Sequence, residues 1–129
     1  MPYDLQIADR LLRLTFHGNI TSADLARLSG ELADAESQSE VSLNGFADLS
    51  AAVGVNLDFD QMLVFAEKRR VTPLKNRVRT AIVAPKDIQF GFARMFQTLN
   101  THPKVTVKVF RDAPSAMQWL DGAGPPGEV

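Results

Sequence analysis

The chain has 129 residues, of which 45% are hydrophobic and 22% charged, and its formal net charge is −1. This length suits one domain, and the composition excludes collagen-like, low-complexity and wholly disordered proteins. The lack of cysteine excludes disulfides, thiolate metal sites and cysteine nucleophiles. No segment resembles a signal peptide or is apolar for long enough to span a bilayer. We therefore expect a cytoplasmic domain that is not an integral membrane protein and needs no cofactor or metal. The balanced charge does not favour a nucleic acid as its partner.

The first third of the chain predicts a β-hairpin followed by a helix. Apolar residues alternate with polar ones over 5–7 and again over 12–16, which is the two-residue period of a half-buried strand. The Gly-Asn pair at 18–19 predicts the end of the second strand. Thr21 is a suitable N-cap, and leucines at helical spacing follow it. We therefore predict an amphipathic helix over 22–37.

The middle of the chain predicts a strand over 41–49 and a helix over 59–70. Asp58 and Gln61 have the spacing of a capping box, which marks the start of this helix. Three basic residues at its end favour the negative end of the helix dipole. We expect one apolar face on this helix, formed by Phe59, Met62, Leu63, Phe65 and Ala66.

The last part predicts a central strand over 78–84, a helix over 87–100 and a strand over 105–109. A short final helix follows Asp112, which we expect to cap it. In the helix over 87–100, the residues at helical spacing that should face the core are Ile88, Phe92, Met95 and Leu99.

The predicted order is ββαβαβαβα. A hairpin followed by alternating units implies a single-domain α/β fold with a mixed sheet, parallel later strands and helices packed on the sheet. We assign residues 1–121 to this domain and 122–129 to a flexible C-terminal tail.

This order, together with three local strings, resembles the STAS-like domains related to bacterial anti-sigma-factor antagonists, above all their stand-alone members. The strings are 46–50 (FADLS), 81–85 (AIVAP) leading into 90–96 (FGFARMF), and 109–120, which ends in AMQWL. The resemblance implies a STAS-like fold and a role in protein interaction or sensing.

One feature of the resembling family is missing. In its phosphorylatable members, an Asp-Ser-Ser-Gly-type motif stands at the start of the helix after the third strand, and a partner kinase modifies its serine. Here the corresponding residues 56–60 read NLDFD, without serine or threonine. We therefore expect a STAS-like domain without the phospho-serine switch, although Ser50 lies upstream and could be modified.

The predicted loop from Asp48 to the next helix offers a first candidate site. Ligands of open α/β sheets tend to sit at the carboxyl ends of parallel strands. A strand-end rim of Asp48, Ser50, Asn56 and Asp58 could therefore bind an anionic ligand. A structural cap is the favoured alternative, because Asp58 and Asp60 already supply negative charge there.

Catalysis is the less favoured reading. Asp48 with His17 is the one pair that suggests acid–base chemistry, and no phosphate-binding, nucleophile-elbow or zinc-protease motif accompanies it. A solvated loop histidine is the favoured explanation of His17, and the same holds for His102, which precedes a proline. We name no catalytic residue.

A basic patch of Lys68, Arg69 and Arg70 is the second candidate site. It could bind phosphate groups or an acidic partner. A solvated helix end is the favoured explanation.

The third candidate is an apolar surface on the two aromatic helices, formed by Phe65, Phe90, Arg94, Met95 and Phe96. These residues exceed what one core-facing stripe needs, so they indicate a wide core, a partner or a pocket.

Two functions remain open. The leading one is a non-enzymatic STAS-like interaction or sensing domain that binds another protein or forms a homodimer. The alternative is a binder of a small apolar, lipid-like or anionic ligand, or a minor enzyme that uses the rim near Asp48.

Overall fold

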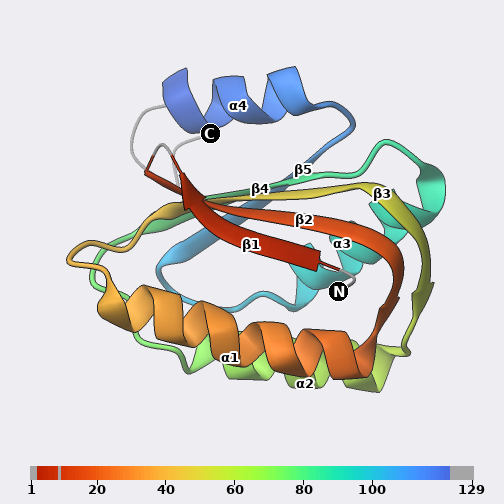
Figure 1. Ribbon diagram of the computed structural model, residues 1–129, viewed down its shortest axis with the longest axis horizontal. Coiled ribbons are helices and arrows are strands. Elements are labelled where there is room, and N and C mark those ends of the chain that lie inside the picture. The colour runs from red at the N-terminus through yellow and green to blue at the C-terminus, as the bar shows by residue number, and fades with distance from the viewer. Residues whose placement is uncertain (1–2, 9, 123–129) are drawn as a thin grey trace.

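A computed structural model describes residues 3–8 and 10–122, and within them five strands form one sheet that four helices cover (Figure 1). The predicted order ββαβαβαβα is confirmed. The elements are β1 (Tyr3–Ala8), β2 (Leu11–Thr21), α1 (Ser22–Gln38), β3 (Asn44–Asn56), α2 (Phe59–Arg70), β4 (Val78–Val83), α3 (Asp87–Leu99), β5 (Val105–Phe110) and α4 (Ala113–Gly122).

The sheet is mixed, as expected. Its strand order is β1-β2-β3-β4-β5, with β1 antiparallel to β2 and every other neighbouring pair parallel. Gly122 belongs to α4, whereas the rest of the proposed tail, residues 123–129, lies outside the described residues.

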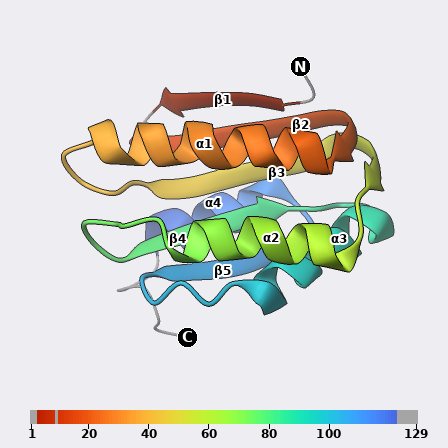
Figure 2. The ribbon, with the colours of Figure 1, turned by 90° about the horizontal axis from the view of Figure 1, so that it is seen from below.

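Three helices share one face of the sheet, and α4 covers the other. Each connection from β2 to β5 moves one strand further in the same direction, so right-handed crossovers place α1, α2 and α3 on one side. Figure 2 shows α1 and α2 running side by side across this face, with α4 behind the sheet. No helix among the described residues is long and apolar enough to cross a membrane.

The predicted helix starts are confirmed by their caps. The Thr21 side chain accepts a hydrogen bond from the Asp24 backbone N–H, and the Asp24 carboxylate accepts one from the Thr21 backbone. Asp58 and Gln61 form the same reciprocal capping box at the start of α2. Each box satisfies backbone donors that the first helical turn leaves free.

Two strands are longer than the sequence suggested. Gly18 and Asn19 do not end β2, which continues to Thr21, because a bulge at this point accommodates Gly18 at a φ of 69°. β3 begins at Asn44 and runs to Asn56 instead of ending at Leu49.

The extended half of β3 has an unusual neighbour. β4 pairs only with Gly45 to Asp48 of β3, so β3 carbonyl groups beyond this point need another donor. The Gln89 side chain of α3 supplies it by donating to the carbonyl oxygens of Ser50 and Ala52. Gln89 is thus fully buried. Ile88, which we expected to face the core, is instead 57% exposed.

Side chains alternate between the two faces of the sheet. On β4, Val78 and Ile82 face α1–α3, whereas Ala81 and Val83 join the cluster beneath α4. Arg79 also faces α4: it is buried, its guanidinium stacks on the Trp119 ring, and it donates to the Trp119 carbonyl oxygen.

Candidate functional site

A cavity of about 130 Å³ lies between the sheet and the helices α1, α2 and α3. Leucines and phenylalanines form most of its wall, so its interior is apolar. Strands and helices contribute together, with Leu14 and Ile82 from the sheet, Leu28 from α1, Met62 and Phe65 from α2, and Phe96 from α3. Such a space suits a small apolar group.

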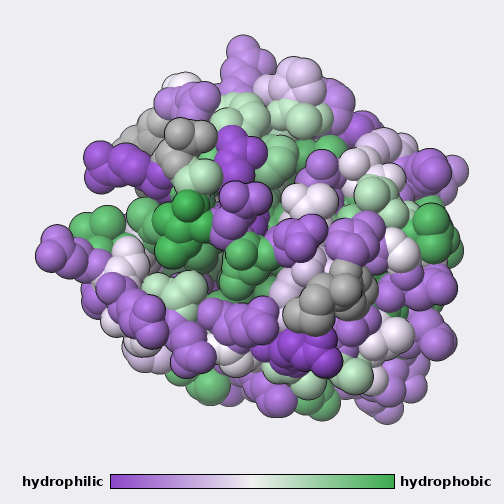
Figure 3. All heavy atoms as spheres, viewed as in Figure 1, coloured by the Kyte–Doolittle hydropathy of each residue, from purple (hydrophilic) through white to green (hydrophobic). Residues whose placement is uncertain are grey.

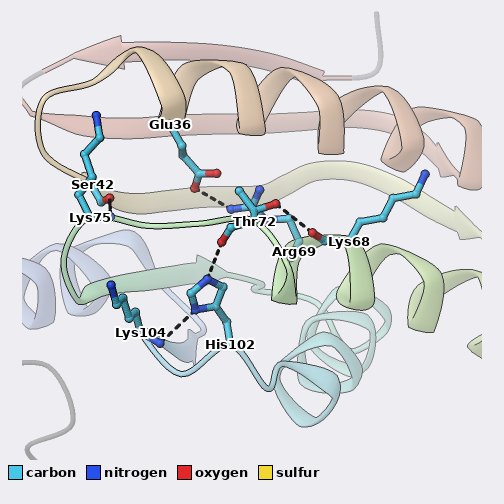
Figure 4. Close-up of polar contacts among 8 residues, drawn as sticks. All are labelled: Glu36, Ser42, Lys68, Arg69, Thr72, Lys75, His102 and Lys104. Atoms are coloured by element: carbon cyan, nitrogen blue, oxygen red, sulfur yellow. Dashed lines mark hydrogen bonds and ion pairs between the residues drawn. The ribbon is translucent and has the colours of Figure 1, made fainter.

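Polar residues occupy part of the cavity wall. Glu36, Arg69, Asn100 and His102 all line it. Glu36 lies near the end of α1 and Arg69 near the end of α2, and Arg69 Nη2 donates to Glu36 Oε2 over 2.6 Å. This ion pair joins the two helices across the cavity wall (Figure 4).

His102 is fixed by two hydrogen bonds. Its Nε2 lies 2.8 Å from the Thr72 carbonyl oxygen, and its Nδ1 accepts from the Lys104 backbone N–H over 3.0 Å. Because a carbonyl can only accept, Nε2 carries the proton, and the ring is in the neutral Nε2–H tautomer. The histidine therefore has no ring nitrogen left for a ligand.

The ion pair, by contrast, leaves one polar atom of each side chain without a partner among the described residues. Glu36 Oε1 and Arg69 Nη1 are buried and have no hydrogen-bond partner within the described part of the chain. This wall of the cavity thus presents one donor and one acceptor beside apolar side chains, an arrangement suited to binding a molecule with a polar head.

The residues proposed as an apolar surface divide between two places. Phe65 and Phe96 line the cavity, and their ring centroids are 5.6 Å apart. Phe90 lies beneath the guanidinium groups of Arg94 and Arg111, and it is half-buried. Met95 is half-buried and Arg94 exposed. Phe65, Phe90 and Phe96 all pack against the same core cluster.

The outer side of α2 carries exposed apolar residues instead. Phe59 is 54% exposed, Leu63 37% and Val64 55%. We expected Phe59 and Leu63 to face the core, but only Met62 and Ala66 of α2 are buried. The reason is geometric: Phe59 and Leu63 are one turn apart on one stripe of α2, Met62 and Ala66 are one turn apart on another, and α2 turns only the second stripe to the core.

The proposed strand-end rim is not a loop. Asp48, Ser50 and Asn56 all belong to β3, where Asp48 lies beside Thr15 of β2 and Asn56 beside Thr21. The Asp48 carboxylate accepts from the Ser50 backbone N–H. Asp58 is the N-cap of α2.

The three basic residues at 68–70 point to different surroundings. The Arg69 side chain is 13% exposed and bonds Glu36, so it belongs to the interior. Arg70 donates to Glu67 one turn earlier, and Lys68 is exposed. The two exposed cations at this helix end, Lys68 and Arg70, are therefore separated in the sequence by the largely buried Arg69.

His17 and Asp48 are not partners. His17 lies on β2 opposite Ala51, and its Nε2 is 3.5 Å from an Asp4 carboxylate oxygen of β1. Among the described residues, no group of three or more histidines and carboxylates is placed to hold a metal ion.

The sequence contained a signal for the polar cavity wall that we did not use. Leu25, Leu28 and Leu32 predict the buried stripe of α1, and Glu36 continues that stripe one turn further. Arg69 likewise continues the stripe of Met62 on α2. A charged residue at such a position predicts a buried partner of opposite charge.

Apart from the cavity, the surface is mixed. On the face shown in Figure 3, hydrophobic residues interrupt the hydrophilic ones in several places between α4 and α1. An open groove there brings together basic residues from separate elements, namely Arg10, Arg13 and Arg77.

Neither a family model nor a curated protein matches the chain. Solved structures do. One is an uncharacterized protein of the DUF3478 family with a SpoIIAA-like fold from Shewanella loihica PV-4, at 19% sequence identity and a TM-score of 0.60, covering 92% of this chain and 91% of its own. Another is the anti-sigma factor antagonist SpoIIAA in its unphosphorylated form, at 12% identity and a TM-score of 0.59, covering 94% of this chain and 99% of its own. The chain therefore has the SpoIIAA-like, or STAS-like, fold that the sequence predicted.

Proposed function

We propose that this chain is a non-enzymatic, cytoplasmic interaction or sensing domain that works by binding another protein chain. The exposed apolar side of α2, with Phe59, Leu63 and Val64, carries this proposal. The fold adds support, because SpoIIAA is described as an anti-sigma factor antagonist, which acts on other proteins. The segment from Val55 to Gln61 has no serine or threonine, so the interaction would not use the family's phospho-serine switch.

The charges on α2 favour a second copy of this chain as the partner. Its first turn carries Asp60, and its last turn carries Lys68 and Arg70. Two copies of α2 that pack antiparallel about a two-fold axis bring the acidic end of each helix to the basic end of the other. Leu63 lies between these ends, where it would meet the partner helix.

Light scattering coupled to size-exclusion chromatography tests this proposal. We expect a dimer for the natural chain and a monomer for Leu63→Lys, because a lysine at the centre of the interface would leave its charge buried. The matched control is Ile7→Lys, which is 56% exposed and lies on β1, the edge strand of the sheet (Figure 2). A monomeric natural chain, or equal dimers of all three proteins, would contradict the proposed partner.

The cavity favours a second candidate function, the binding of a small apolar molecule. Its volume of about 130 Å³ is close to the roughly 150 Å³ of an apolar cavity that takes up benzene. Met62 lines it, whereas Met117 lies on α4 at the opposite face of the sheet. With ¹³C-labelled methionine methyl groups, benzene should shift the Met62 resonance and leave that of Met117 in place. An unshifted Met62 at saturating benzene would exclude this function.

A further inference from the structure

The Glu36–Arg69 ion pair sets the chemistry of a ligand in the cavity. Both side chains line the cavity, and their single hydrogen bond occupies Oε2 of Glu36 and Nη2 of Arg69. Oε1 and Nη1 are buried without a partner in the described chain. Buried donors and acceptors are nearly always paired, with protein groups, water or a ligand, so these two atoms require a further partner.

The charges nearby disfavour an ionic head. Glu36 and Arg69 neutralise each other, and both ring nitrogens of His102 are already bonded to Thr72 and Lys104. A carboxylate would lie close to the free oxygen of Glu36, and an ammonium would lie close to the free nitrogen of Arg69. A neutral head that both accepts and donates a hydrogen bond satisfies both atoms at once.

We propose that the cavity binds a small neutral amphiphile with an amide-like head. The head accepts from Arg69 Nη1 and donates to Glu36 Oε1, while a body of a few carbon atoms lies against the apolar wall that includes Met62 and Phe65. The volume of about 130 Å³ limits the molecule to roughly the size of benzene. This inference rests on the second candidate function, the binding of a small apolar molecule.

Three probes of similar size separate the contributions of body and head. They are butanamide, which is neutral with a donor and an acceptor, butanoate, which is charged at neutral pH, and benzene, which has no polar head. Each is titrated against the full chain while the methyl resonance of Met62 is followed, with Met117 as the internal reference. We expect butanamide to shift Met62 saturably and butanoate to leave it unchanged.

A double variant tests the role of the ion pair. Glu36→Leu with Arg69→Met replaces both charges by apolar groups of similar length and leaves no buried charge unpaired. Butanamide should bind this variant roughly ten-fold more weakly, the effect of losing two hydrogen bonds, while benzene binding persists. The matched control is Glu67→Leu with Arg70→Met, which removes the exposed ion pair of α2 and should change neither probe.

The outcomes are distinct. Preferential butanamide binding that depends on the Glu36–Arg69 pair supports the inference. If benzene shifts Met62 but butanamide does so no better, or equally well in the double variant, the head-group inference is wrong and the cavity still binds apolar molecules. If no probe shifts Met62, both fail, and water is then the occupant of the unpaired polar atoms. The dispersion of the methyl spectrum reports in every case whether the variant is folded.

Discussion

Glu36 of α1 and Arg69 of α2 form a 2.6 Å ion pair in the interior, with side chains that are only 7% and 13% exposed. The pair is the polar contact that ties the end of α1 to the end of α2, and it lies in the wall of the core cavity. A buried pair of this kind contributes little net stability but becomes costly when one partner is removed.

Removing one partner of the pair should therefore lower the free energy of unfolding more than replacing both partners together. Glu36→Leu leaves the Arg69 guanidinium buried without a counter-charge, so we expect a loss of about 3–5 kcal/mol in the free energy of unfolding. Adding Arg69→Met should restore much of this loss. Urea denaturation of the single variants and the double variant provides the measurement.

The exposed pair of Arg70 with Glu67 is the control for this cycle. Glu67→Leu should change the free energy of unfolding by about 0–1 kcal/mol, since both side chains are about half exposed. If the losses of Glu36→Leu and Arg69→Met simply add in the double variant, the two side chains do not interact as described.

Tyr3 should titrate far above its ordinary range. Burial raises the pKa of Tyr3 to about 12, and its hydroxyl also donates to the Glu31 carboxylate over 2.7 Å. The unfolded chain loses this proton near pH 10 while the folded chain still holds it. The contribution of Tyr3 to stability is thus constant below about pH 10 and is lost as the pH rises towards about 12.

Tyr3 is the single tyrosine of the chain, so its tyrosinate absorbance can be titrated directly. Glu31→Gln should lower the pH of the tyrosinate transition. The substitution removes the negative charge and weakens the acceptor, both of which favour the protonated hydroxyl. In Tyr3→Phe, the decrease in the free energy of unfolding that Tyr3 causes above about pH 10 should disappear. A tyrosinate transition near pH 10 in the natural, folded protein would contradict the buried placement.

Gln89 should be important for the extended half of β3. Gln89→Leu removes the donors to the carbonyl oxygens of Ser50 and Ala52 and the acceptor for the Lys86 backbone N–H. We expect a loss of about 1–3 kcal/mol in the free energy of unfolding. Hydrogen exchange should also become faster in the last residues of β3.

The control for this prediction is Gln118→Leu on α4, where the glutamine is exposed and makes no hydrogen bond that involves β3. Its free energy of unfolding should stay within about 0.5 kcal/mol of the natural value. Equal effects of the two substitutions would show that Gln89 does not support the strand.

Two glycines should respond to alanine in opposite directions. Gly18 has a φ of +69° at the β2 bulge, so Gly18→Ala strains the backbone and should cost about 1 kcal/mol. Gly30 lies on the exposed side of α1 with no atom near an added Cβ, so Gly30→Ala should stabilise the helix by about 0.5–1 kcal/mol. Thermal unfolding of both variants tests the contrast; the same sign for both would count against it.

The features that the sequence predicted well are local. The capping boxes at Thr21 and Asp58 lie within four residues each, so the helix starts could be recognised without knowledge of the fold. The alternation over 105–109 and the β-rich segment over 78–84 likewise predicted strands that the structure contains. Their order was enough to predict the fold class.

The features that were missed depend on contacts between distant segments. β3 continues to Asn56 because it pairs with the extended β2 as far as Thr21, and Gln89, more than thirty residues later, donates to two of its carbonyl oxygens. The core cavity could not be predicted, because its volume depends on how residues from three helices and the sheet fill the space between them. Glu36 could have been recognised from its position in the leucine stripe, but its partner Arg69 lies on another helix.

Helix α2 borders the cavity on one side and solvent on the other. Met62, Phe65 and Arg69 line the cavity. Phe59, Leu63 and Val64 are exposed on the outside. A guest that tilts or stiffens this helix from within would also alter the shape offered to a neighbouring chain. Thermodynamics then makes the effect reciprocal, so that assembly changes affinity for the guest by the same factor by which the guest changes assembly. Helix α2 would in this way couple ligand binding in the core to association of the chain at its surface.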